Sequence, residues 1–250
     1  AAATEPEQRL LAGLVSGEMR QGALDALLLD AVAEAAGVPT EEVRRAAMLA
    51  GATEPVAVAA LGAADPAGAR AALAAFGLTV GRPVRPMLAA SAPDVATAVA
   101  GFGERPVVVD AKLDGIRIQV HRARDDVRVF TRSLDDVTAR VPEVAAVVRA
   151  LPASSLVLDG EALAVGPDGR PRPFQETASR SAPRDAELAA ARLAPFFFDV
   201  LHVDGRDLLD APLAARLDEL ERVVPPAHQV ARVVTDDHAV AADAIARWVA

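Results

Sequence analysis

The proline-rich stretch "GRPVRPMLA", at residues 81–89, separates two parts of the chain whose apolar residues follow different periods. Proline lacks a backbone N–H and disfavours helical geometry in the residue before it, so Pro83 and Pro86 predict an extended segment. Before this stretch apolar side chains recur at helical spacing, and from Pro106 onward they follow strand patterns. We therefore expect a domain boundary near Gly81, with one domain at residues 1–80 and a second at residues 81–250.

Residues 1 to about 78 are expected to be all-helical. The expected helices are Glu7–Val15, Gly22–Ala36 ending at Gly37, one that follows an N-cap at Thr40, one near Glu54–Leu61 and one near Pro66–Phe76. Their apolar faces most simply form a core between packed helices. The less favoured alternative is that Arg20, Arg44 and Arg45 contact a phosphate backbone.

The second part mixes strand and helix patterns. "PVVVDAKL", "IRIQVHR" and "DVRVFTR" predict three successive strands of an antiparallel meander, and "SLVLDGEALAV", "APFFFDVLHVDG" and "HQVARVV" predict three more. Helices are expected at Pro142–Leu151, Leu213–Val223 and Asp237–Val249, a short helix at Pro93–Ala100, a turn at "GPDG" and short helices around "RPFQETASR". Strands interleaved with helices, without strict alternation, indicate an α+β fold.

Composition narrows the class of protein. The 250 residues carry a net charge of −9 and no cysteine, which excludes disulfides and thiolate metal sites. An acidic total argues against a non-specific nucleic-acid binder, although placed arginines can still meet phosphates. No apolar run reaches membrane-span length and no signal-peptide pattern is present, so we expect a soluble cytoplasmic protein without a membrane partner.

Lys112, in "DAKLDGIR", is the only lysine in the sequence, and every other basic side chain apart from histidine is an arginine. Arginine stays protonated and is a poor nucleophile, whereas lysine can lose its proton and attack an electrophile. A lone lysine could be a surface residue that drift has not replaced. The residues around it favour a nucleophile, with Asp114-Gly115 forming a tight turn just after it.

Four further residues could serve a nucleotide bound near this lysine. Arg117 and Arg132 could lower the lysine pKa and stabilise phosphate charge, Glu161 could accept a ribose hydroxyl or help hold a metal, and Phe198 could stack on a base. Each also has a structural interpretation. Arg132 could be a solvated strand-end arginine, Asp-Gly-Glu could be an ordinary turn, and the three adjacent phenylalanines could be core, with Phe197 facing away from the other two.

The order of these motifs resembles that of the ATP-dependent DNA ligases, within the covalent nucleotidyltransferases that include RNA ligases and mRNA capping enzymes. "AKLDGIR" is similar to their first motif, with Lys112 as the adenylylated lysine and Arg117 facing the nucleotide. "FTRSLDDVT", "LDGEAL" and "FFFDVLH" resemble later segments. They map a nucleotide-contacting arginine to Arg132, the ribose-contacting acid to Glu161 and the adenine-stacking aromatic to Phe198. "RPMLA" and "RPFQETASR" add similarity to bacterial ligases of archaeal and eukaryotic type.

The resemblance implies a fold and an activity. The helical part would be the later portion of a DNA-binding domain, and the rest a mixed, mainly antiparallel α+β adenylation domain of ATP-grasp-like type. The implied enzyme is a monomeric DNA ligase (ATP) that uses ATP and Mg²⁺. It would carry AMP on Lys112 and seal nicked double-stranded DNA in replication, repair or recombination.

Two departures from the family pattern shape these expectations. Asp110 stands where the family usually has a glutamate that contacts the adenine amino group. The later motifs of Glu-Gly-x-x-x-Lys and Lys-x-Lys type, and the oligonucleotide-binding domain, have no counterpart in a chain with one lysine. We therefore expect a fragment of a ligase with little complete activity. The alternatives are a non-catalytic DNA-binding fragment and an RNA-ligase or capping-type nucleotidyltransferase.

Overall fold

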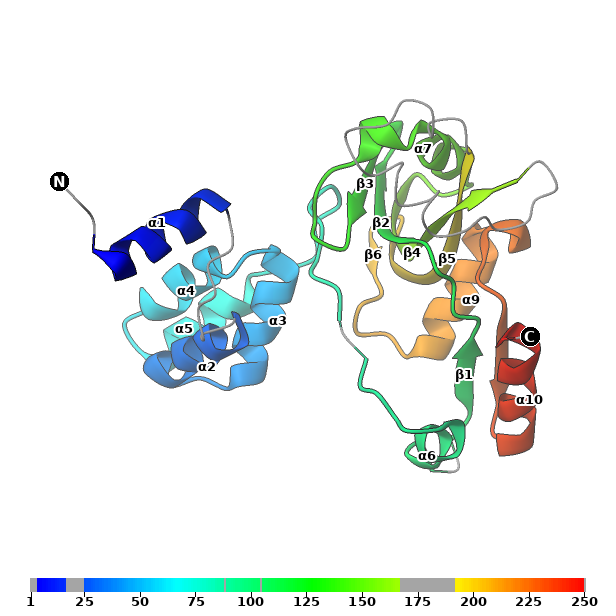
Figure 1. Cartoon of the computed structure of the whole chain (residues 1–250), viewed down its shortest axis with the longest axis horizontal. Coiled ribbons are helices and arrows are strands. Elements are labelled where there is room, and N and C mark those ends of the chain that lie inside the picture. The colour runs from blue at the N-terminus through cyan, green and yellow to red at the C-terminus, as the bar shows by residue number, and fades with distance from the viewer. Residues whose placement is uncertain (1–3, 17–24, 88, 104, 167–191, 250) are drawn as a thin grey trace. The chain divides into compact units, whose positions relative to one another are not determined.

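The computed structural model describes residues 4–16, 25–87, 89–103, 105–166 and 192–249. The chain divides into two compact units, Ala1–Gly77 and Leu78–Ala250 (Figure 1). Among the described residues, no helix is long and apolar enough to cross a membrane. The expected helical stretch "RPFQETASR" lies outside the described residues, as does the "GPDG" turn apart from Gly166.

The described part of the first unit is helical. It contains α1 (Glu5–Ser16), α2 (Asp25–Ala36), α3 (Thr40–Ala50), α4 (Glu54–Leu61) and α5 (Pro66–Ala74). Helices α2 to α5 share an apolar core that includes Val43 and Val56, which are fully buried, so the expected helix-packing core is confirmed for these four helices. Gly37 follows α2 with φ of +65°, a left-handed geometry that suits glycine. The expected N-cap is one residue out of place, because α3 begins at Thr40 itself and the preceding Pro39 provides no side-chain cap.

A five-stranded antiparallel sheet forms the centre of the second unit, in the order β3-β2-β4-β5-β6. Its strands are β2 (Ile116–Ala123), β3 (Asp126–Thr131), β4 (Ser155–Val165), β5 (Arg192–Val203) and β6 (Arg206–Asp207). Helices α7 (Pro142–Arg149) and α9 (Leu213–Val223) share one apolar core with the sheet. The short turns η1 (Thr138–Arg140) and η3 (Pro226–His228) contribute no buried residue to it. The mixed α+β class with antiparallel sheets is thereby confirmed.

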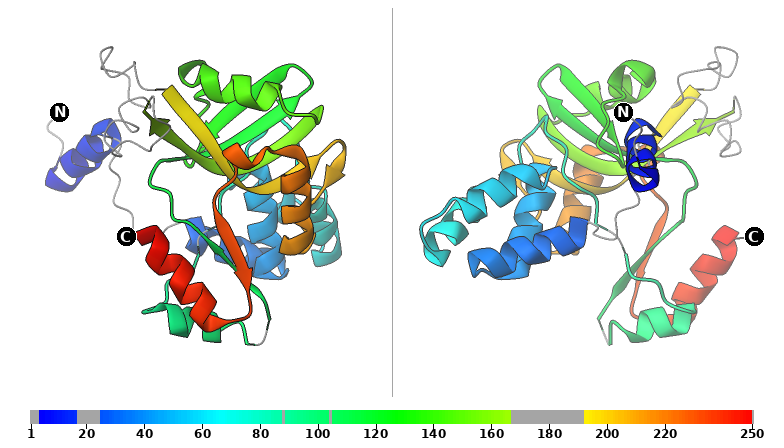
Figure 2. Two further views of the ribbon diagram at one scale, coloured as in Figure 1. Left: turned by 90° about the vertical axis from the view of Figure 1, so that its right-hand side faces the viewer. Right: turned by 60° about the vertical axis from the view of Figure 1, so that its left-hand side comes forward.

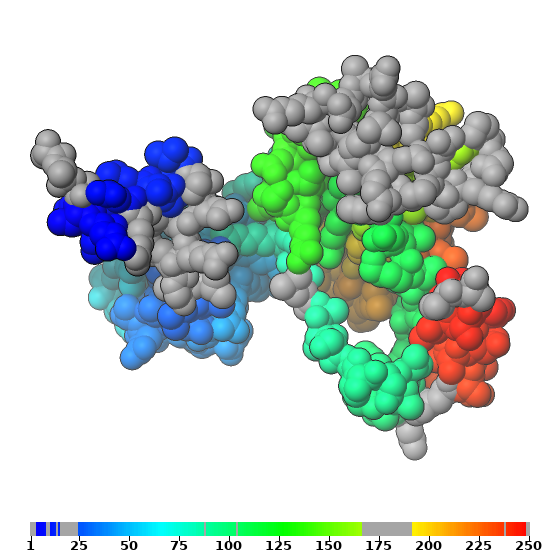
Figure 3. Space-filling model, viewed as in Figure 1, coloured from blue at the N-terminus to red at the C-terminus, as the bar shows by residue number. Residues whose placement is uncertain are grey.

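The first predicted strand does not join the meander. Strand β1 (Val107–Asp110) instead pairs with β7 (Arg232–Thr235) in a separate two-stranded antiparallel sheet. Helices α6 (Val95–Ala100) and α10 (His238–Val249) lie beside this pair (Figures 2 and 3). Val99, Val107 and Ala241 form a small apolar core among these elements. The meander was wrong because local alternation predicts a strand without specifying its partner, and β1 pairs with a strand far along the chain.

On β2, the face of the large sheet opposite the apolar core is polar. Ile118 and Val120 of β2 enter the apolar core, so the alternating residues Arg117, Gln119 and His121 project from the opposite face. Gln119 and His121 are buried there because the extended segment after Gly77 crosses them. The Val84 amide donates to Oε1 of Gln119 over 2.8 Å, and the Gly81 amide donates to Nδ1 of His121 over 3.0 Å. The proline-rich segment is therefore fastened to the face that also carries Arg117.

Candidate active site

Lys112 lies in the short connection between β1 and β2, at residues 111–115, and its side chain is exposed. Hydrogen bonds hold both ends of this loop. The Ala111 amide donates to the carbonyl of Ala231 over 2.8 Å, and the Gly115 amide donates to Oε1 of Glu161 over 3.1 Å. Nζ of Lys112 donates to the carbonyl of Leu113 over 2.6 Å. The loop that carries Lys112 is thus hydrogen-bonded beside the two-stranded sheet at one end and to the five-stranded sheet at the other.

Glu161 lies within β4, so the predicted strand over "SLVLDGEALAV" is confirmed and the alternative of a turn at Asp-Gly-Glu is wrong. The strand runs through Asp159, Gly160 and Glu161, with a register shift between Asp159 and Gly160. A Cβ on Gly160 would lie 2.5 Å from the carbonyl oxygen of Phe196, so glycine allows close approach of β5. Burial raises the pKa of the Glu161 carboxyl, and the Gly115 amide, Lys112 and Arg117 partly offset that effect.

Arg117 is held by two neighbours. It donates to both carboxylate oxygens of Asp159 on β4, from Nε over 3.2 Å and from Nη2 over 2.7 Å. Its guanidinium carbon also lies 5.5 Å from the centre of the Phe198 ring, within cation–π range. The hydrogen bond to Asp159 raises the pKa of Arg117, while burial raises the pKa of Asp159 despite that partner. This clamp fixes a permanently charged group on the polar face of the sheet.

One cavity of about 350 Å³ brings together all six residues singled out from the sequence. They are Asp110, Lys112, Arg117, Arg132, Glu161 and Phe198. Met87, Ala89, Ala111, Leu113 and Val230 complete its lining. The cavity therefore combines an amine, two guanidinium groups, two carboxylates and an aromatic ring from five separate segments of the chain.

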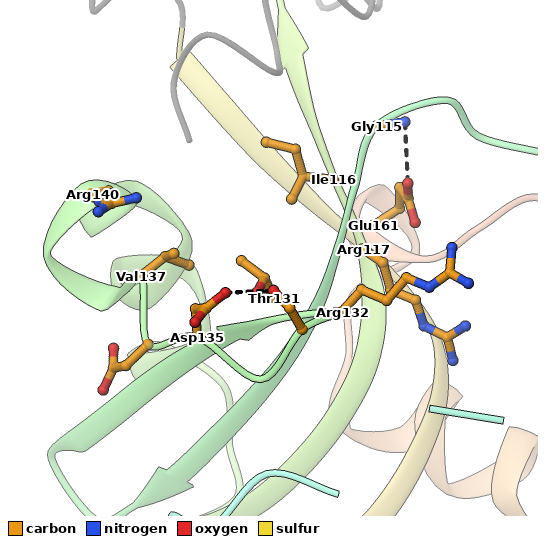
Figure 4. A pocket seen from close by; sticks show the side chains of 11 residues that line it. Gly115, Ile116, Arg117, Thr131, Arg132, Asp135, Val137, Arg140 and Glu161 are labelled. Carbon is orange, nitrogen blue, oxygen red and sulfur yellow. Dashed lines mark hydrogen bonds between the residues drawn. The ribbon is translucent and has the colours of Figure 1, made fainter. Parts of the chain in front are cut away.

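A second, wider cavity of about 800 Å³ shares Arg117, Arg132 and Glu161 with the first. Figure 4 shows the side chains of Arg117 and Arg132 beside each other near Glu161, with Arg140 at the other end of this cavity. Arg132 follows the end of β3 and is exposed, as a strand-end arginine should be. The two arginines therefore stand where the two cavities meet.

Two charged residues near these cavities were missed by sequence reasoning. Asp159 was passed over as part of a turn, although its place in "LDGEAL", two residues before Glu161, puts both carboxylates on one face of a strand. Arg232 gave no signal, because it faces Asp110 only through the pairing of β1 with β7. Its Nε lies 3.7 Å from Oδ1 of Asp110. Burial raises the pKa of Asp110, Arg232 opposes that shift, and Asp199 adds to it.

The carboxylate and histidine side chains of the structure can be compared with the ligands of the Mg²⁺ ion that the sequence suggests. Within the described ranges, no three His, Asp or Glu side chains converge on a point that could hold an ion. Mg²⁺ nevertheless needs few protein ligands, since it is commonly bound by one or two carboxylates together with substrate phosphates and water. A single carboxylate at Glu161, beside a cavity suited to phosphates, fits that mode of binding.

Comparison with known proteins identifies the family. A sequence model described as "ATP dependent DNA ligase domain" matches residues 86–250. A "Probable DNA ligase" from Beutenbergia cavernae is 71% identical over 96% of this chain and 48% of its own length. One from a Nocardioides species is 60% identical over 98% of this chain and 46% of its own length.

The chain thus spans about half the length of the curated relatives that it matches. Among solved structures, "mycobacterial DNA ligase D complexed with ATP and MES" aligns with 25% identity over 58% of this chain and 46% of its own, at a TM-score of 0.44. The assignment rests on the sequence matches, which cover most of the chain, its cavity residues included. The chain belongs to the ATP-dependent DNA ligase family.

Proposed function

We propose that the 350 Å³ cavity binds ATP and that Lys112 is the nucleophile that becomes adenylylated. The observation that carries this proposal is the convergence of six sequence-separated residues on one cavity that contains the only lysine of the chain. A nucleoside triphosphate needs cations for its phosphates, an acceptor for its ribose and a flat apolar surface for its base. The cavity supplies each of these.

Each residue has a proposed part. Arg117 and Arg132 contact phosphate and sugar, and Glu161 accepts a hydrogen bond from a ribose hydroxyl. Phe198 stacks on the adenine, and Asp110 accepts from its amino group. Asp159 acts through Arg117, because its two hydrogen bonds set where that guanidinium points.

The first step forms a phosphoramidate. Nζ of Lys112 loses its proton and its lone pair forms a bond to the α-phosphorus, while the bond from that phosphorus to the bridging oxygen breaks. Pyrophosphate leaves with the electron pair. In the complete enzyme an oxygen of the 5′-phosphate at a nick then attacks the same phosphorus and returns the amine. The 3′-hydroxyl finally attacks the 5′-phosphate, loses its proton and releases AMP.

A bound Mg²⁺ would neutralise phosphate charge and so assist displacement at phosphorus. Glu161 is the residue proposed to help hold it. We assign residues 1–80 to the later part of a DNA-binding domain and residues 81–250 to the earlier part of an adenylation domain. The substrate of the whole protein is then nicked duplex DNA.

These 250 residues alone should adenylylate themselves weakly and should not seal nicks efficiently, because the later lysine-containing motifs are not among them. Incubation with α-labelled ATP and Mg²⁺, followed by a denaturing gel and mass spectrometry of the Lys112 peptide, tests the proposal. Weak label on Lys112 is expected. Lys112→Arg is the matched control, since it keeps the charge and removes the nucleophile. Label that persists in Lys112→Arg would exclude Lys112, and strong label or sealing would contradict the weak activity.

A further inference from the structure

Arg232 is a buried cation that lacks hydrogen bonds. Only 10% of its side chain is exposed, and Nε, Nη1 and Nη2 have no hydrogen-bond partner among the described residues. Its nearest acid is Asp110, directly opposite it in the β1–β7 pairing. The 3.7 Å from Nε to Oδ1 is too long for a hydrogen bond and short enough for strong attraction.

Burial of the Arg232 guanidinium is energetically costly unless its N–H groups find a hydrogen-bond acceptor. A guanidinium cannot shed its charge, and buried charged donors without acceptors are strongly destabilising. Asp110 is the available acceptor, and it lines the cavity with a side chain that is 39% exposed. A small movement of the carboxylate toward Nε would make the bond, and a donor arriving from the cavity would engage the remaining carboxylate oxygen.

We propose that Arg232 is a positioning residue that holds the Asp110 carboxylate toward the base of the bound nucleotide and thereby sets a preference for adenine over guanine. The inference rests on the proposed nucleotide site and adds a residue that does not line the cavity. It also explains how aspartate can stand in a position that suits a longer acid. The strand partner, rather than a further methylene, would place the carboxylate.

Discrimination between adenine and guanine follows from the group that each purine carries at C6. Adenine presents an amino group at C6, which donates to a carboxylate, whereas guanine presents a carbonyl oxygen, which repels it. A carboxylate held ionised by Arg232 makes both effects stronger. The charged groups that act on Asp110 are Arg232, which favours its ionised form, and Asp199, which opposes it. Asp199 is itself paired with Arg216 over 2.8 Å.

The test is equilibrium binding of ATP and of GTP, by calorimetry, to the 250-residue chain and its variants. In Arg232→Met we expect the ratio of GTP to ATP dissociation constants to fall by about tenfold, as for loss of a charge-assisted hydrogen bond. Arg232→Lys should restore part of the ratio because it keeps the charge. The fall of this ratio in Arg232→Met should be greatest near the lower end of the working pH range, because Asp110 without the neighbouring cation takes up a proton there first.

Two controls separate the outcomes. Arg128→Met removes an exposed strand arginine, paired with Asp126 at 3.4 Å, and should leave the ratio unchanged. Arg232→Met replaces a buried charge by an apolar chain of similar length, so the fold should survive, and circular dichroism checks this. Binding of ATP with an unchanged ratio in Arg232→Met would overturn the role of Arg232 alone. Failure of the unaltered chain to bind ATP would overturn the nucleotide site itself.

Discussion

The backbone amide of Gly115 donates a hydrogen bond to Oε1 of Glu161, and this contact ties the loop that carries Lys112 to the middle of β4. A Cβ added to Gly115 would lie 2.4 Å from the carbonyl oxygen of Ala162 and 3.0 Å from Cγ of Glu161. The loop can therefore approach the strand only because residue 115 has no side chain.

Gly115→Ala should displace this loop. Overpacking of this kind is expected to cost about 1–3 kcal/mol of unfolding free energy, and it should lower affinity for ATP because Lys112 and Glu161 separate. Denaturant unfolding and nucleotide binding measure the two effects. Gly77→Ala is the matched control, because a Cβ there meets no atom within 4 Å. Equal stability of the two variants would contradict the close approach.

Removal of Asp159 should weaken nucleotide binding although Asp159 is not proposed to touch the nucleotide. Without it, Arg117 loses two hydrogen bonds and its fixed direction, at an expected cost of about 1–3 kcal/mol. Binding of ATP to Asp159→Ala, Arg117→Ala and the double variant forms a double-mutant cycle. The double variant should bind no more weakly than Arg117→Ala. Additive losses would show that the two residues act separately. Asp126→Ala, at an exposed pair with Arg128, is the control.

Phe198 and Phe196 offer a matched pair on β5. Both are partly exposed and alternate with the buried Phe197, but of the three only Phe198 lines the 350 Å³ cavity. Phe198→Ala should weaken ATP binding about tenfold or more, because stacking of a base on an aromatic ring contributes about 1–3 kcal/mol. Phe196→Ala should have a clearly smaller effect. The same loss in both variants would indicate disturbance of the strand instead of lost stacking.

His121 should make stability depend on pH. Burial lowers its pKa to about 4 in the folded state, below an unfolded value near 6.5, and His202 adds to the shift. Nδ1 accepts from the Gly81 amide, which assigns the proton of the neutral ring to Nε2, facing Gln119. The folded state therefore binds fewer protons. The contribution of His121 to the free energy of unfolding is complete above pH 6.5, and it falls by on the order of 3 kcal/mol as the pH drops toward 4.

Melting temperatures of the unaltered chain and of His121→Gln, measured from pH 7 to pH 4, check this expectation. Burial raises the pKa values of Asp110, Asp159 and Glu161, so these groups work in the opposite direction, and the difference between the two proteins is the informative quantity. That difference should shrink as the pH falls. His228→Gln is the control for replacing a histidine elsewhere in the chain. A difference in melting temperature between the unaltered chain and His121→Gln that does not change with pH would contradict the lowered pKa of His121.

Because Lys112 is the only lysine, an amine-reactive reagent can modify just this side chain and the N-terminus. ATP should protect Lys112 from acylation and leave the N-terminus reactive, because the exposed amine lies on the cavity wall. Peptide mass spectrometry quantifies both sites in the same sample, so the N-terminus is an internal control. Unchanged acylation of Lys112 at saturating ATP would place the nucleotide elsewhere.

The sequence alone determined much of the local structure. Residue spacing predicted α9 and β4 at the bounds observed, and α10 to within one residue, because periodicity reports which faces of an element are buried. The motif order also named six residues that the fold brings to one cavity. Their chemical roles remain predictions for the experiments above.

The tertiary structure decided the pairings. Strand β1 pairs with β7 instead of β2, and this long-range choice puts Arg232 opposite Asp110. The bond of Asp159 to Arg117 and the fastening of Gly81 to His121 likewise join residues far apart in the chain. Such contacts depend on which buried surfaces and backbone hydrogen bonds are satisfied together. No window of sequence contains that information, so the groups that orient the site appear only in the folded protein.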